Sequence, residues 1–158
     1  MIRFLAKGAD VEVELAGSEA AILLGLPGLL GSAGVDKGDP ARSRLNPILY
    51  RDDEDASREY ERLAAKDRGA VRSADQERFG EMLQTASEGP LLLGREDAAV
   101  WARVLGEARV VLAARHGLFD SGLPSEVPSD PEVVLVMLLG YMQEELVGEM
   151  LKTMEDKP

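Results

Sequence analysis

The sequence predicts a mainly α-helical fold: a compact helical domain with a small N-terminal β-hairpin. Three observations lead to this prediction. Two short runs near the N-terminus alternate apolar with polar residues, and later segments repeat apolar residues at spacings of three and four. In addition, the helix-start signal Asp130-Pro131-Glu132 precedes ten uncharged, almost wholly apolar residues, Val133 to Met142. We expect one domain over residues 1–158, divided into a hairpin (1–16), a helical body (17–154) and a tail (155–158).

The hairpin is predicted from a period of two. Apolar side chains occupy alternate positions in residues 2–6 and again in residues 11–15, and Gly8-Ala9-Asp10 between them suits a tight turn. A lone hairpin is only marginally stable in water. We therefore expect its apolar face to pack on helices.

An interrupted helix and a loop are expected in residues 17–40. Ser18 is a candidate N-cap with Glu19 in the first turn, and apolar residues continue from there to Leu26. Pro27 lies inside this pattern, and proline lacks the N–H that an interior helical position needs, so it should end or kink the helix. Residues 31–40 are rich in Gly, Asp and Ser and are predicted to form a loop.

The next segment contains signals for two helical pieces. Asp52-Asp53 is a candidate cap for a helix over about 54–66. Gly69 is a candidate break before a second piece that spans 71–83, because glycine is a weak helix former. Gly89-Pro90 should stop the second piece.

A strong amphipathic helix is predicted from Arg95. Its apolar stripe consists of Trp101, Leu105, Ala108 and Leu112. His116-Gly117 should end it, with Gly117 in the left-handed conformation. His116 is interpreted as a cation that caps the helix carbonyls, with a catalytic or pH-sensing role as the alternative.

The last helix is expected to run from Pro131 to about Met154 and to be the central helix of the fold. Its first turns are apolar on every side, and such a helix must be surrounded by protein. The chain itself can supply this cover; the alternative is a homodimer in which Met142, Leu146 and Met150 meet their symmetry mates. Because the nearby glutamates would repel across a two-fold axis, we expect a monomer or a weak homodimer.

The charge pattern argues against tight binding of nucleic acid. The formal net charge is −11, and nucleic acid affinity depends on Lys and Arg that neutralise phosphates. Nine of the eighteen basic residues fall within residues 42–78, but this window also contains nine acidic residues. From Asp120 onward, nine acidic residues face only Lys152 and Lys157, so the C-terminal part suits a basic protein surface.

Several classes of chemistry are excluded by composition. The chain has no cysteine, which excludes disulfides, thiol catalysis and thiolate metal sites, and its single histidine excludes a multi-histidine metal site. It contains no Walker loop, nucleophile elbow, dinucleotide fingerprint or HExxH spacing. We therefore expect no enzymatic activity, no cofactor and no metal.

The N-terminus is charged after two residues, and the ten-residue apolar run is half of the ~20 needed to span a bilayer, so we expect a cytoplasmic protein without membrane contact.

Two individual residues, Arg109 and Tyr141, have two readings each. Arg109 is expected at the edge of a buried helix face, paired with an acid from another helix, and a partner-binding role is the alternative. Tyr141 and Gln143 lie where the last helix changes from apolar to charged. Tyr141 is expected to form a hydrogen bond at the rim of the core, again with a partner surface as the alternative.

Four blocks of the chain together resemble one family. They are 46–53 (NPILYRDD), 59–63 (EYERL), 101–105 with 108–115 (WARVL and ARVVLAAR) and 139–147 (LGYMQEELV). Their order and spacing are similar to the actinobacterial family long catalogued as a domain of unknown function and later named AosR-like, for oxidative-stress transcriptional regulator. The resemblance covers most of the chain.

The resemblance implies transcription regulation by contact with a sigma factor or RNA polymerase, with a redox-active cysteine pair as the sensor. This chain has no cysteine, so no disulfide switch of its own can operate. The family also tends to be encoded near the adaptor of the Clp protease and near cysteine-biosynthesis genes. A role as adaptor or scaffold in Clp-type proteolysis or sulfur metabolism is therefore the alternative. The candidates for partner contact are Tyr50, Arg51, Arg109, Arg115, Tyr141 and Gln143.

Overall fold

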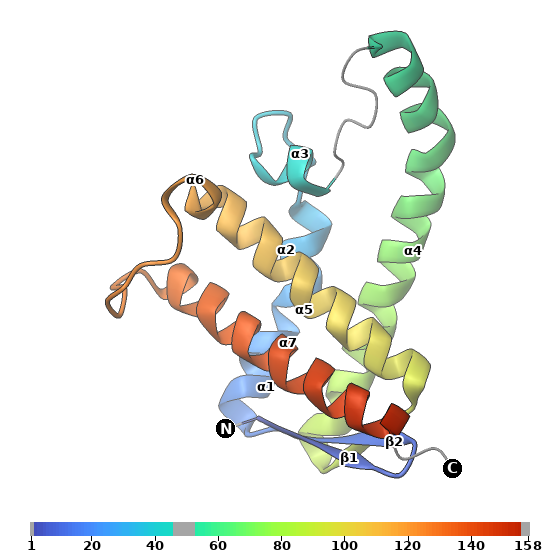
Figure 1. Ribbon diagram of the computed structural model, residues 1–158, viewed down its shortest axis with the longest axis vertical. Helices are drawn as coiled ribbons and strands as arrows, with labels where there is room; N and C mark the ends of the chain where they lie inside the picture. Colours follow the sequence, from blue (N-terminus) through green and yellow to red (C-terminus); the bar gives the residue numbers. More distant parts are fainter. Residues whose placement is uncertain (1, 46–52, 156–158) are drawn as a thin grey trace.

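The computed structural model describes residues 2–45 and 53–155, and it confirms a mainly helical fold with a small N-terminal sheet. The elements are β1 (Arg3–Lys7), β2 (Asp10–Glu14), α1 (Gly17–Leu24), α2 (Leu26–Ser32), α3 (Ala41–Leu45), α4 (Glu54–Glu88), β3 (Leu91–Leu93), α5 (Arg95–Arg115), α6 (Leu118–Ser121) and α7 (Pro131–Glu155). Figure 1 shows α5 in the middle of the molecule, with α7 and α4 on either side of it and the sheet at its lower end.

The predicted hairpin is confirmed, and a third strand extends it. All three strands are antiparallel in the order β1-β2-β3, with Phe4 opposite Val13 and Val11 opposite Leu93. These four side chains are buried, so one face of the sheet covers the helical core. β3 was not predicted, because three leucines in a row show no alternation of apolar and polar residues.

The cap of α1 differs from the prediction. Ala16, and not Ser18, precedes the helix, and the Glu19 carboxylate accepts a hydrogen bond from the Ala16 N–H at 3.3 Å. The same carboxylate accepts from the Ile2 N–H, which joins the hairpin to α1. The prediction of Ser18 as the cap was wrong, because Glu19 at the third helical position accepts from the Ala16 N–H and no capping hydroxyl is needed.

Proline and glycine act unequally as helix breakers in this chain. Pro27 does interrupt the first helix: α1 ends at Leu24, and Pro27 lies in the first turn of α2, where its missing N–H is tolerated. Gly69, in contrast, does not break α4, which runs unbroken over 35 residues from the Asp53 cap. Open space surrounds Gly69, so nothing nearby forces the backbone out of the helix. The predicted break was therefore wrong.

The central helix is α5, and the prediction that gave this place to the last helix was wrong. Ten residues of α5 are buried, against four of α7. Trp101 of α5 is fully buried between Phe4 of the sheet and Phe79 of α4, at ring distances of 6.3 Å and 4.9 Å. Gly117 ends the helix at φ 66°, as predicted. The short helices α3 and α6 were not predicted, since neither exceeds five residues.

Only one face of α7 is buried. Val136, Leu139, Met142 and Leu146 pack into the core, whereas Val134 and Met137 are each 40% exposed and Tyr141 is 44% exposed. The helix lies on the outside of α5 and beside the hairpin, and none of the described elements covers its outer face (Figure 1). Of the three residues named for the homodimer alternative, Met142 and Leu146 are fully buried within the chain, and Met150 is partly buried.

Candidate functional site

The contact between α5 and α7 rests on two glycines that accommodate large polar side chains. A Cβ at Gly106 of α5 would lie 2.5 Å from Nε2 of Gln143, and one at Gly140 of α7 would lie 3.2 Å from a terminal guanidinium nitrogen of Arg109. Gln143 Nε2 also donates to the Ala102 carbonyl at 3.2 Å. Each helix therefore lays one long side chain over a glycine of the other. This contact positions two of the six predicted partner-binding residues.

Arg109 lies on the surface, and the expected acidic partner is missing. Its side chain passes over Gly140, and no acidic side chain that the structure describes forms an ion pair with it. The prediction of an interhelical ion pair was therefore wrong. An unpaired guanidinium at an exposed position keeps all its donors available for a ligand.

Arg115 is engaged inside the fold. Its guanidinium donates to both carboxylate oxygens of Asp39, at 2.8 Å and 3.3 Å, and to the Ser32 hydroxyl at 3.4 Å. The hydrogen bond from Arg115, together with backbone N–H groups of Gly34 and Ala41, holds the pKa of the Asp39 carboxyl far below its usual range. A partner-binding role for Arg115 stays a prediction, since its described contacts are structural.

His116 joins the end of α5 to the start of α7. Its ring nitrogens lie 3.5 Å from an Asp130 carboxylate oxygen and 3.2 Å from one of Glu132. Asp130 also caps α7, accepting a hydrogen bond from the Glu132 N–H at 2.9 Å. His116 therefore lies at the end of α5 and also contacts the acidic residues at the start of α7.

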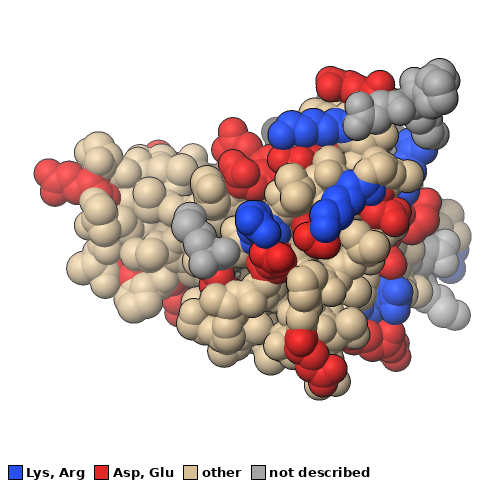
Figure 2. Space-filling model, turned by 90° about the horizontal axis from the view of Figure 1, so that it is seen from below, with Lys and Arg blue, Asp and Glu red and all other residues tan. Residues whose placement is uncertain are grey.

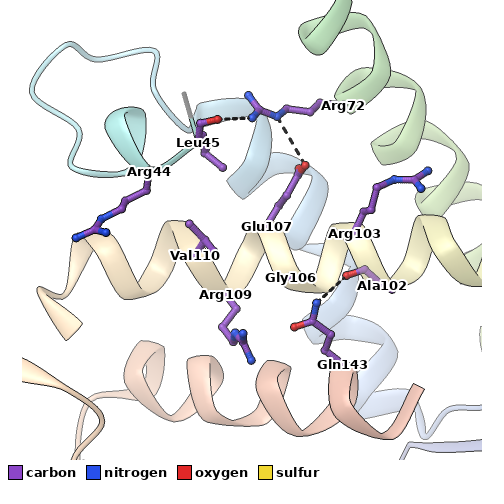
Figure 3. Close-up of a pocket in the computed structure, with 10 residues that line it drawn as sticks. All are labelled: Arg44, Leu45, Arg72, Ala102, Arg103, Gly106, Glu107, Arg109, Val110 and Gln143. Carbon is purple, nitrogen blue, oxygen red and sulfur yellow. Dashed lines mark hydrogen bonds and ion pairs between the residues drawn. The ribbon is translucent and has the colours of Figure 1, made fainter. Parts of the chain in front are cut away.

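A shallow trough of about 400 Å³ runs along the outer face of α5, and Figure 3 shows its lining. Side chains from α3 and α4 lie above it in this view, and those of Arg109 and Gln143 lie below. The lining residues are Arg44, Leu45, Arg72, Ala102, Arg103, Gly106, Glu107, Arg109, Val110 and Gln143. Four of the ten are arginines, although the whole chain carries a net charge of −11.

Two of these arginines already bind acidic groups. Arg103 donates to both oxygens of Asp75, at 2.8 Å and 3.0 Å. Arg72 donates to the Leu45 carbonyl at 2.7 Å and lies 3.7 Å from a Glu107 carboxylate oxygen. Burial raises the pKa of the Glu107 carboxyl, and Arg72 opposes this effect. The Glu107 carboxylate is thus partly buried and faces Arg72.

A second surface feature is the apolar stripe of α7, which we define as Val134, Met137 and Tyr141. The spacing of three and then four residues places them on one helix face. Tyr141 forms no hydrogen bond with any described residue, so the expected bond at the rim of the core was wrong. Figure 2 shows wide areas without Lys, Arg, Asp or Glu on the left, the side on which α6, the loop after it and the first half of α7 lie in Figure 1, while Lys and Arg gather towards the right.

Several candidate residues were missed or lie outside the described part. The arginines of the trough come from three helices, and no local spacing in the sequence links them. Val134 and Met137 do have a local signal, the apolar run of the last helix, but that run predicted that both would be enclosed by protein. Tyr50 and Arg51 lie outside the described residues.

Comparison with protein families places residues 1–150 in a family described as a domain of unknown function (DUF2017). The chain belongs to the DUF2017 family. The match spans the sheet and nearly all of the helical body, so both the trough and the stripe lie inside the family domain. No curated protein and no solved structure matches the chain.

Within residues 2–45 and 53–155, no three His, Asp or Glu side chains are grouped in a way that would hold a metal ion. No helix in this part of the chain is both long and apolar enough to cross a membrane.

Proposed function

We propose that this DUF2017 protein is a non-enzymatic regulator that binds a component of the transcription machinery, a sigma factor or RNA polymerase. The observation that carries the proposal is the apolar stripe of α7. Three large side chains remain 40–44% exposed on a helix whose opposite face is fully buried. Exposed apolar groups in one row are typical of surfaces that another protein covers.

The charges around the stripe indicate the kind of partner. Glu132 lies at its N-terminal end, and Glu144 and Glu145 lie one turn beyond Tyr141, all exposed. An acidic rim around an apolar centre favours a partner surface with the opposite arrangement, an apolar row flanked by Lys and Arg. Nucleic-acid-binding proteins carry such basic surfaces.

The choice of transcription as the process rests on the resemblance of the chain to the AosR-like regulators. Block 139–147 of that resemblance includes Tyr141, so the stripe and the resemblance meet in the same helix. A cysteine-based redox switch is not part of the proposal, because the chain has no cysteine. Regulation here would depend on the abundance of the protein or on its partner.

A pull-down from the native cell extract tests this function. We expect the wild-type protein to retain a sigma factor or polymerase subunits, and Met137→Asp to lose at least about 90% of them, because a charge would enter the centre of the contact. Val127→Asp is the matched control, since Val127 is 90% exposed and lies in the loop before α7.

Two results would contradict the proposal. One is equal recovery of polymerase subunits by Met137→Asp and by the wild type. The other is recovery of Clp protease components in place of polymerase, which would support the adaptor alternative. Circular dichroism of both variants confirms that they are folded.

A further inference from the structure

The exposed face of α7 continues beyond the apolar stripe as a regular row. Exposed residues recur along this face at alternating spacings of three and four, and none of the described elements covers them (Figure 1). We call this row the heptad seam; it consists of Val134, Met137, Tyr141, Glu144, Gly148 and Leu151. The same spacing is typical of a helix that pairs with a second helix along its length.

The heptad seam is complementary to itself when two copies of α7 run antiparallel. A two-fold axis near Met142 places Val134, which is 40% exposed, opposite Leu151 of the second copy, which is 55% exposed. The same axis places Met137 opposite Gly148 of the second copy. Nothing lies within 4 Å of the position of a Cβ at Gly148, so there is space for the methionine side chain. Each large apolar side chain of the seam therefore meets an apolar residue or an open space.

The charges of the heptad seam favour the same arrangement. Glu144 faces Tyr141 of the second copy, whose hydroxyl can donate to the carboxylate. Arg109 pairs with no acidic side chain that the structure describes, and it passes over Gly140 beside the seam. Its level along α7 is therefore close to that of Glu144 of the second copy. The arrangement gives each unpaired guanidinium a carboxylate of the other chain.

A parallel pair of α7 helices lacks these contacts. It would set Glu144 against Glu144 of the second copy, which brings two like charges together. It would also set Gly148 against Gly148, which leaves a gap in the row. The repulsion between glutamates that argues against a dimer thus applies to the parallel arrangement and not to the antiparallel one.

We infer that two copies of this chain associate through the heptad seam as an antiparallel helix pair, with Arg109 of each copy binding Glu144 of the other. Such a contact is isologous, so it closes after two copies. Its length over residues 134–151 is about 26 Å, at 1.5 Å for each helical residue. One helix pair of this length buries less surface than a permanent dimer needs. We therefore expect a weak dimer that forms at micromolar concentration.

The dimer would regulate access to the apolar stripe, a consequence that rests on the proposed function. Val134, Met137 and Tyr141 are covered in the dimer and accessible in the monomer. The proposed partner binds the same three side chains, so partner binding and self-association compete. Because a larger share of the protein is dimeric at higher concentration, the amount of accessible stripe rises more slowly than the amount of protein.

Sedimentation equilibrium of the full chain, from low micromolar to near-millimolar concentration, tests the association. We expect the measured mass to rise from that of one copy towards that of two. Arg109→Glu and Glu144→Arg should each weaken association about tenfold or more, because each sets like charges opposite one another. Glu126→Arg is the matched control: it makes the same charge change at an exposed position in the loop before α7, and its association should stay within about twofold of the wild type.

A mixture of Arg109→Glu and Glu144→Arg separates a contact between copies from a contact within one chain. In a mixed dimer, both contacts between positions 109 and 144 again join opposite charges. The mixture should therefore associate about as strongly as the wild type, although neither variant does so alone. A contact within one chain would be unchanged by mixing. Both substituted residues are exposed, so the variants should fold, and the fluorescence of the single tryptophan, Trp101, checks this.

Three results would overturn the inference. The first is the mass of a single copy at every concentration, which would leave the stripe for another protein. The second is an equal loss of association in Glu126→Arg and Glu144→Arg. The third is a mixture of Arg109→Glu and Glu144→Arg that stays monomeric.

The pull-down distinguishes this inference from the proposed function. A protein that dimerises through the heptad seam but retains no sigma factor or polymerase subunit would contradict the proposed function and support the dimer. A protein that retains polymerase subunits but is monomeric at every concentration would contradict the dimer alone.

Discussion

At the scale of single residues, Asp39 joins three separate parts of the chain through hydrogen bonds of one carboxylate. Its carboxylate accepts from the backbone N–H groups of Gly34 and Ala41, both at 3.0 Å, and from Arg115. These bonds connect the loop after α2, the start of α3 and the end of α5. Because the side chain of Asp39 is only 7% exposed, its charge depends on these partners for stabilisation.

Asp39→Asn should therefore lower the free energy of unfolding by about 1–3 kcal/mol at pH 7, since Arg115 loses its anionic partner. The effect should depend on pH. The lowered pKa of Asp39 means that, below about pH 5, the unfolded chain takes up a proton that the folded chain does not. The stabilisation from this carboxylate is present near neutral pH and is lost towards low pH.

Urea unfolding at pH 7 and at pH 3, followed by Trp101 fluorescence, measures this change. The difference in stability between the wild type and Asp39→Asn should shrink at pH 3. Asp120→Asn, an exposed position on α6, is the control and should change stability by less than about 0.5 kcal/mol. An equal effect of Asp39→Asn at both pH values would contradict the role assigned to the ion pair.

At the scale of elements, α7 shows that an apolar helix is not necessarily an enclosed one. Its ten-residue uncharged run supplies Val136, Leu139 and Met142 to the core and leaves the apolar stripe outside. The helix is therefore amphipathic in its packing and not in its composition. This distinction leads to opposite expectations for neighbouring positions.

Leu139→Asp should prevent folding, while Met137→Asp should leave the fold intact. Leu139 is fully buried, and an unpaired carboxylate there, together with the lost packing, should reduce stability by more than about 4 kcal/mol. Met137 lies in the exposed stripe, where we expect a loss of no more than about 2 kcal/mol, from partly buried apolar surface and the weaker helix propensity of Asp. Far-UV circular dichroism and urea titration compare the two, and similar midpoints would contradict this assignment of faces.

At the scale of the whole molecule, α5 connects the other layers. It contacts α7 on one side, α4 on another, and also the sheet, α2 and α3. The acidic residues that give the net charge of −11 are spread over these layers, whereas the excess positive charge of the trough is local. A duplex several turns long would meet mostly acidic surface.

We therefore expect no tight binding of duplex DNA by the protein alone. A gel-shift titration at physiological salt should show no complex at micromolar protein concentration, because few phosphates can be neutralised at one time. Affinity in the micromolar range with a steep dependence on salt would show that this expectation is wrong. The same titration with Arg44→Ala would then identify the trough as the contact.

The sequence predicted the types of the larger elements and several of their ends. The hairpin, the interruption at Pro27, the end of α5 at Gly117 and the start of α7 at Pro131 all follow from local backbone preferences, which act within a few residues. The third strand, α3 and α6 were missed because each is too short to show a period. The sequence predicted Arg109, Tyr141 and Gln143 as candidate site residues. It did not predict the other arginines of the trough or the exposure of Val134 and Met137.

The place of each helix in the fold was decided only by tertiary structure. The periodic recurrence of apolar residues identifies the side chains that can be buried, but it does not identify the element that covers them. For this reason the last helix appeared central, while α5 holds that place and α7 keeps one apolar face exposed. The trough depends on the same tertiary arrangement, since Arg44, Arg72 and Arg109 come from helices that only packing brings together.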